Sequence, residues 1–143
     1  MIITTNILKK AIQIATTAHA GQTDKGGNPY ISHPMRLMEN VESVEEKIVA
    51  VLHDVVEDTE VTFADLEKEG VPQVCIDALK LLTHEKDVPY MDYVKSISSN
   101  EIATSVKIAD LKDNSDLSRL ESITDKDIAR VEKYTKALSI LQA

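Results

Sequence analysis

The hydrophobic residues of this chain recur three and four positions apart along most of its length. The stretch before Gly21 shows the pattern, with apolar residues at Ile7, Leu8, Ala11, Ile14, Ala15 and Ala18. This spacing places apolar side chains on one face of an α-helix. It predicts a first helix that runs to about Ala20, where glycine suits the position after the last helical turn.

The later helices are predicted by the same periodicity and by residues typical of helix starts. Ser43 with Glu46, and Thr62 with Asp65, have the spacing of a capping box, and the first of these boxes opens a central helix that runs to about Asp58. Further helices are expected to begin near Ser32, Pro72, Pro89, Glu101 and Thr124. Because no segment alternates like a β-strand, residues 1–143 are predicted to form a single all-α domain, a bundle of about seven or eight helices.

Composition and charge narrow the class of protein. Of 143 residues, 43% are hydrophobic and 28% are charged, which is typical of a globular protein. The net charge of −8 argues against a nucleic-acid binder that works by neutralising phosphates. No apolar stretch is long enough to cross a membrane, no signal peptide is visible, and the single Cys75 fits a reducing compartment. We therefore expect a cytoplasmic protein with neither nucleic-acid nor membrane partners, and its oligomeric state stays open.

The chemically most informative stretch lies at the end of the central helix. His53 and Asp54 follow residues 48–52, a run of five apolar residues, and Glu57 and Asp58 come one helical turn later. Charge beside such a run is costly to bury unless it is paired or binds a metal. A histidine nitrogen and a carboxylate oxygen suit a divalent ion such as Mn, Fe or Zn. The alternative is an amphipathic helix whose last charged residues are simply exposed.

Other polar residues stand at the ends of predicted helices. His33 lies at a helix start and Asp110 follows an apolar stripe. Taken alone, each is more typical of a local hydrogen-bonding or surface residue than of a metal ligand. His19 is either a partner of the helix dipole or part of a pocket wall, and His84 in a polar loop is expected to be exposed.

Together these segments resemble a known family. The order His…His-Asp…Asp is that of the HD superfamily of metal-dependent phosphohydrolases. Residues 18–34, 52–59 and 106–114 are similar to the three motifs of the RelA/SpoT-type (p)ppGpp hydrolase domain. The resemblance extends over roughly residues 5 to 120 and is greatest to the small stand-alone members of that group.

The resemblance implies a role for each matching residue. The family's four metal ligands, which usually bind Mn²⁺, match His33, His53, Asp54 and Asp110. Glu57 and Asp58 match the acidic pair that orients and activates the attacking water. Asn114 matches a polar residue lining the substrate site, and Lys25 matches a basic residue near the nucleotide.

The implied reaction is removal of the 3′-pyrophosphate of (p)ppGpp by a metal-activated water. The chain departs from the family at Asp24 and Asp116, which occupy usually basic positions. Carboxylates there would weaken binding of a polyanionic ligand if both face it. A phosphatase for another nucleotide, such as a nucleoside phosphate or an NADPH-like dinucleotide, is therefore a second reading. A non-catalytic domain that senses a nucleotide is the third, although it would not need Glu57 and Asp58.

Overall fold

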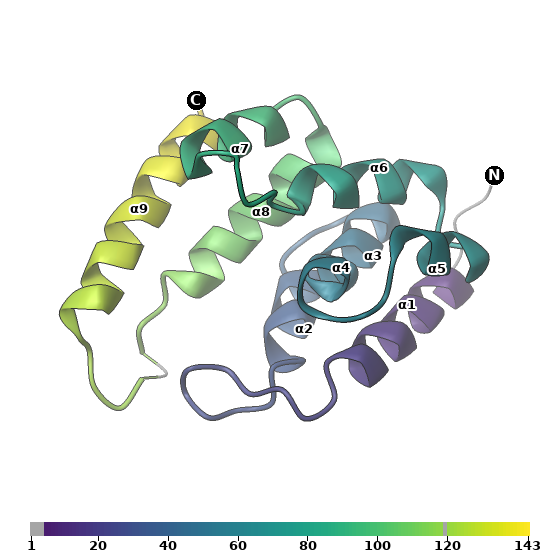
Figure 1. Cartoon of the computed structure of the whole chain (residues 1–143), viewed down its shortest axis with the longest axis horizontal. Coiled ribbons are helices and arrows are strands. Elements are labelled where there is room, and N and C mark those ends of the chain that lie inside the picture. The colour runs from purple at the N-terminus through teal and green to yellow at the C-terminus, as the bar shows by residue number, and fades with distance from the viewer. Residues whose placement is uncertain (1–4, 119) are drawn as a thin grey trace.

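The computed structural model describes residues 5–118 and 120–143, which form helices joined by loops (Figure 1). Among these residues there is no β-strand, and one isolated bridge pairs Thr23 with Pro29. The predicted all-α fold is confirmed. None of the described helices has the length and hydrophobicity needed to span a lipid bilayer. The helices are α1 (Thr5–Ala18), α2 (Ser32–Glu39), α3 (Val44–Leu52), α4 (Val55–Asp58), α5 (Phe63–Lys68), α6 (Gln73–Leu82), α7 (Tyr90–Ile97), α8 (Glu101–Asn114) and α9 (Asp125–Leu141).

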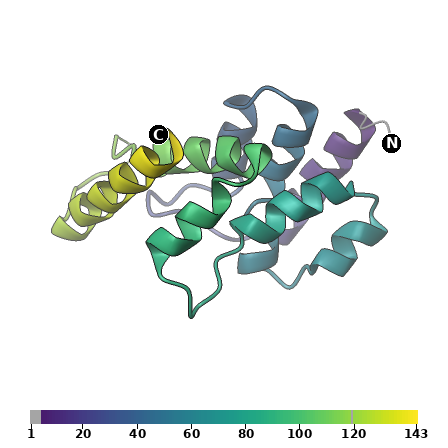
Figure 2. The same cartoon turned by 90° about the horizontal axis from the view of Figure 1, so that it is seen from above.

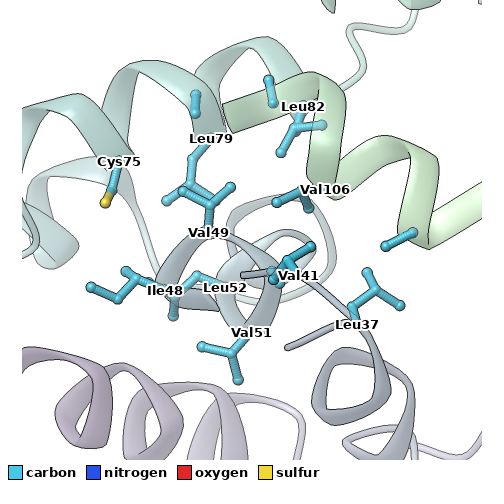
Figure 3. Packing of buried hydrophobic residues seen from close by; sticks show 14 of the residues in the cluster. Leu37, Val41, Ile48, Val49, Val51, Leu52, Cys75, Leu79, Leu82 and Val106 are labelled. Atoms are coloured by element: carbon cyan, nitrogen blue, oxygen red, sulfur yellow. The ribbon is translucent and has the colours of Figure 1, made fainter. Parts of the chain in front are cut away.

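Helix α3 is the centre of the hydrophobic core. It packs against α1, α2, α6 and α8. Ile48, Val49, Val51 and Leu52 project from it in several directions, toward side chains of the surrounding helices (Figure 3), and all four are 0% exposed. A helix that is apolar on every side is one that is buried on every side. This burial explains why residues 48–52 contain no charge.

The predicted starts of two helices, α3 and α5, are confirmed. Ser43 accepts a hydrogen bond from the Glu46 amide at 3.0 Å, and the Glu46 carboxylate accepts one from the Ser43 amide at 3.0 Å. The box formed by Thr62 and Asp65 is also present. These contacts fix where α3 and α5 begin, because they satisfy amides that have no partner inside the helix.

The prediction of one continuous central helix to Asp58 is wrong. The helix stops at Leu52 and restarts as α4, with His53 and Asp54 between the two segments. Both the backbone amide of His53, at 3.5 Å, and its ring Nδ1, at 2.8 Å, are directed at the Ala50 carbonyl oxygen. This local side-chain bond competes with the regular helical pattern. Asp54, with φ of −107° and ψ of 0°, lies outside helical geometry.

The last two helices run antiparallel (Figures 1 and 2), with α9 at one side of the molecule and α8 between α9 and α3, both of which α8 contacts. The inward face of α9 is formed by Ala137 and Leu141, which are buried, with Tyr134 and Leu138 partly covered. Ile128, which belongs to the same periodic pattern, is 49% exposed. The apolar spacing of α9 would place Ile128 toward the core, but the first turns of this helix extend beyond the core.

Two matched substitutions test this description of the core. Ile48→Ala removes a fully buried side chain and should lower the free energy of unfolding by about 2–5 kcal/mol. Ile128→Ala removes the same atoms from an exposed helical position and should change it by no more than about 0.5 kcal/mol. Urea unfolding followed by circular dichroism measures both. Equal losses would contradict the placement of these two residues.

Candidate metal centre

The four predicted ligands come together where α2, α8 and the junction between α3 and α4 meet. His33 Nε2 lies 2.9 Å from Asp110 Oδ1, although the two residues are 77 positions apart. His53 Nε2 lies 2.9 Å from Asp54 Oδ2 and 3.4 Å from Asp110 Oδ1. One ligand atom from each of His33, His53 and Asp54 lies within 4.8 Å of the others. Helices distant in sequence therefore bring two imidazoles and two carboxylates to one point.

The hydrogen bonds of His53 show that this cluster fits a cation. Its Nδ1–H donates to the Ala50 carbonyl at 2.8 Å, so Nε2 of the neutral ring carries a lone pair. Within the described part of the chain, Nε2 is buried and has no aligned hydrogen-bond partner, despite the nearby oxygens of Asp54 and Asp110. A lone pair facing carboxylate oxygens requires a proton or a metal ion between them. The residues present fit a divalent metal.

Asp110 is the most enclosed acid of the cluster. Its Oδ2 accepts a hydrogen bond from Lys107 Nζ at 3.0 Å, and its Oδ1 accepts one from Asn114 Nδ2 at 2.9 Å. Burial by itself raises the pKa of Asp110, but Lys107 and the two histidines outweigh it and hold the pKa well below its usual range. The carboxylate is therefore ionised and available to bind a cation.

Tyr30 and His19 complete one wall of the centre. The Tyr30 hydroxyl donates a short hydrogen bond to Asp54 Oδ2, and burial together with the charge of Asp54 raises the pKa of Tyr30 above its usual range. The ring of His19 lies 4.8 Å from that of Tyr30, and its Nδ1 is 3.0 Å from Gln22 Oε1. His19 is therefore buried behind Tyr30, and it is not one of the residues that line the cavity described below.

The acidic pair lies beside the cluster on α4. Asp54, Glu57 and Asp58 each place an oxygen within 4.8 Å of the others, and Glu57 and Asp58 are exposed. Glu57 Oε1 accepts a hydrogen bond from the His84 backbone amide at 2.9 Å. Partial burial, together with the charge of Asp54, raises the pKa of both Glu57 and Asp58. A carboxylate with a raised pKa is better suited to accept a proton.

The expectation that His84 is exposed is wrong. Its ring stacks on Tyr93 with centroids 4.4 Å apart, and Nε2 donates to the Val88 carbonyl at 2.7 Å. These contacts hold the backbone of the loop between α6 and α7 against Glu57. No local pattern of residues predicts this arrangement, because it depends on how α7 packs.

A cavity of about 360 Å³ opens beside His33. Its walls include Lys25 and Asn114, and also Asp24 and Asp116. Both aspartates stabilise the loops in which they lie. Asp24 Oδ1 accepts hydrogen bonds from the backbone amides of Gly26 and Asn28 at 2.9 and 3.0 Å, and Asp116 Oδ1 accepts one from the Ser118 amide at 2.9 Å. Both residues nevertheless line the cavity.

Several proteins of known description are similar to part of this chain. No protein-family model matches the chain. Over 65 residues the chain is 43% identical to the bifunctional (p)ppGpp synthase/hydrolase SpoT of Escherichia coli K12. This match covers 43% of the chain and 9% of SpoT. Over 110 residues it is 34% identical to the putative chloroplastic GTP diphosphokinase RSH1 of Arabidopsis thaliana, covering 73% of this chain and 12% of that protein. The chain thus spans a small share of the length of these curated relatives.

A solved structure extends the likeness to the whole fold. It belongs to a metazoan orthologue of SpoT, described as hydrolysing ppGpp and acting in starvation responses, and matches with a TM-score of 0.79 at 22% identity. The match covers 100% of this chain and 89% of the other. The chain has the fold of a SpoT orthologue. The resemblance to the RelA/SpoT-type hydrolase domain that the three motifs indicated is confirmed.

The titration of the two histidines predicts how the metal-free protein responds to pH. Burial lowers the pKa of His33 and His53, but the neighbouring carboxylates outweigh it, and each pKa is raised above 6.5. A raised folded-state pKa adds stability that is complete below pH 6.5 and is lost as pH rises through the folded pKa values. The free energy of unfolding of the metal-free protein should therefore fall as pH increases from about 6 to 9.

Urea unfolding in the presence of a chelator measures this dependence. His33→Gln should reduce its slope, because glutamine does not bind the proton. Added Mn²⁺ should reverse the trend, since a metal ion competes with protons for the same nitrogens and binds better at higher pH. The same slope in His33→Gln and the wild-type protein would contradict the titration of this ring.

Proposed function

We propose that this chain is an enzyme that removes the 3′-pyrophosphate of (p)ppGpp with the help of a bound divalent ion, most suitably Mn²⁺. The observation that carries the proposal is the convergence of His33, His53, Asp54 and Asp110 from three separate motifs. The activities named for SpoT and for the metazoan orthologue support it. The cavity beside His33 gives a nucleotide access to the cluster.

In the proposed mechanism, one set of side chains holds the ion and another handles the attacking water. His33, His53, Asp54 and Asp110 hold the ion, and Asn114 and Lys107 hold Asp110 in place. When bound, the ion lowers the pKa of water and so supplies hydroxide near neutral pH. Glu57, with its raised pKa, accepts the proton of the attacking water, and Asp58 orients it.

The substrate side of the reaction involves the cavity. The oxygen of the attacking water bonds to the phosphorus that carries the 3′ oxygen, and the bond between that phosphorus and the 3′ oxygen breaks. Pyrophosphate is released, and the 5′-phosphorylated guanosine is left with a free 3′ hydroxyl. Lys25 and Asn114 line the cavity on the side of His33 and are proposed to contact the nucleotide. The positive charge of Lys25 complements the phosphates there.

A second candidate substrate follows from the acidic walls. Asp24 and Asp116 lie in the same cavity and disfavour a densely charged ligand. A nucleotide with fewer phosphates, hydrolysed by the same residues, is the alternative. The third reading, a nucleotide sensor without turnover, is disfavoured by the placement of Glu57 and Asp58 next to Asp54.

A product assay decides between these readings. The protein is supplied with Mn²⁺ and ppGpp, and pyrophosphate and orthophosphate are resolved. We expect pyrophosphate and GDP in equal amounts, with the activity lost on chelation and restored by Mn²⁺. Release of orthophosphate from another nucleotide, with no product from ppGpp, would show that the substrate is that nucleotide and would leave the proposed mechanism unchanged. No turnover of any nucleotide by metal-bound protein would overturn the enzymatic proposal.

A substitution at Glu57 tests the proton acceptor. Glu57→Gln keeps the size of the side chain and removes its basicity, so kcat should fall by a factor on the order of 10² to 10⁴ while Mn²⁺ stays bound. Glu60→Gln makes the same change three positions later, at an exposed residue outside the acidic cluster, and should retain the wild-type rate. Undiminished turnover in Glu57→Gln would show that another group accepts the proton.

A further inference from the structure

A second layer of charged residues lies directly behind His33. His33 Nδ1 is 2.6 Å from Asp113 Oδ2. Arg36 holds the same carboxylate through two bonds, from Nε to Oδ1 at 2.9 Å and from Nη2 to Oδ2 at 3.0 Å. His33 and Arg36 lie on α2, whereas Asp113 lies on α8, so the network also joins these two helices.

This contact determines which nitrogen of His33 is available to a metal. An ionised carboxylate only accepts hydrogen bonds, so Nδ1 must carry the proton that it donates to Asp113. In the neutral ring Nε2 then carries the lone pair, and Nε2 is the atom that lies 2.9 Å from Asp110 Oδ1. The Ala50 carbonyl fixes the same tautomer for His53, but it is a neutral acceptor. A negatively charged acceptor makes the imidazole a stronger ligand as well as orienting it.

Arg36 gives Asp113 its orientation. The Asp113 side chain is only 9% exposed, and a nearly buried carboxylate is costly unless it is paired and hydrogen-bonded. The planar guanidinium forms two parallel bonds with it, which fix the plane of the carboxylate as well as neutralise it. With that plane fixed, one oxygen is directed at His33 Nδ1 while both face Arg36.

We propose that Asp113 is a positioning residue for the metal ligand His33, and that Arg36 acts on the metal centre through Asp113. The inference rests on the proposed metal site. Neither residue touches the position of the metal; their effect is to hold His33 in one tautomer and one orientation. Removing either should weaken metal binding before it affects any later step.

The test is a Mn²⁺ titration of the full chain, in which the electron paramagnetic resonance signal of free Mn²⁺ reports the dissociation constant. Losing a hydrogen-bond partner of a metal-bound histidine typically weakens binding about 10–100-fold. We expect Asp113→Asn, which keeps a neutral acceptor, near the lower end of that range and Asp113→Ala near the upper end. Turnover lost at low Mn²⁺ should return when Mn²⁺ saturates the variants.

Asp116→Asn is the matched control. It removes the same charge from the wall of the same cavity, one turn beyond Asp113, at a residue whose carboxylate accepts bonds from Ser118. Its affinity for Mn²⁺ should stay within about two-fold of wild type, because Asp116 is exposed and solvent screens its charge. A loss as large as that of Asp113→Asn would show a general charge effect and overturn the positioning role.

Arg36 is tested by combining substitutions. Arg36→Gln should weaken Mn²⁺ binding, and the double variant with Asp113→Asn should bind no worse than Asp113→Asn alone, because Arg36 acts through the carboxylate. Additive losses would contradict this. If the wild-type protein fails to bind Mn²⁺, the proposed metal site itself is wrong. If the wild type binds and Asp113→Asn and Asp113→Ala bind equally well, only the positioning role is wrong.

Discussion

The charge of Asp110 is the constraint on which the rest of the centre depends. The carboxylate is 5% exposed and lies at the core-facing side of α8, where an unpaired negative charge would be strongly unfavourable. Lys107 neutralises one oxygen, and His33 and His53 face the other. Asp54 adds a second carboxylate to the same histidines. One divalent ion would satisfy the buried Asp110, the partly buried Asp54 and the two imidazole lone pairs together.

The packing of the helices holds these groups together. Residues 48–52, the apolar last turns of α3, fix the position of His53 because α3 is enclosed by α1, α2, α6 and α8. The break after Leu52 then lets Asp54 leave helical geometry and reach its partners, while α4 presents Glu57 and Asp58 beside them. The geometry of the four proposed ligands is thus set by rigid helices, and the pair proposed to orient water and accept its proton lies on a short exposed segment. This division suits a site that must bind an ion tightly and still admit a nucleotide.

The sequence predicts the helices well, and it indicates which four residues converge, because both features leave local signals. Apolar periodicity and capping boxes depend on residues a few positions apart, and the ligands occur in motifs with their own spacing. The break at His53 could not be predicted, since it arises when the ring bonds to Ala50 in place of the regular pattern. Asp113 and Arg36 also gave no signal, because the contact with His33 joins positions 80 apart and a charged residue near a helix end is ordinarily solvated. The same holds for His84, whose loop is ordered by α7.

The central claim is that one divalent ion binds between α2, α8 and the junction of α3 and α4. A crystal structure of the protein with Mn²⁺, using anomalous scattering recorded at the manganese absorption edge, tests it most directly. We expect one strong peak contacted by Nε2 of His33, Nε2 of His53 and carboxylate oxygens of Asp54 and Asp110. A peak held by Glu57 and Asp58 alone, with His53 Nε2 unbound, or no peak at a saturating concentration, would contradict it.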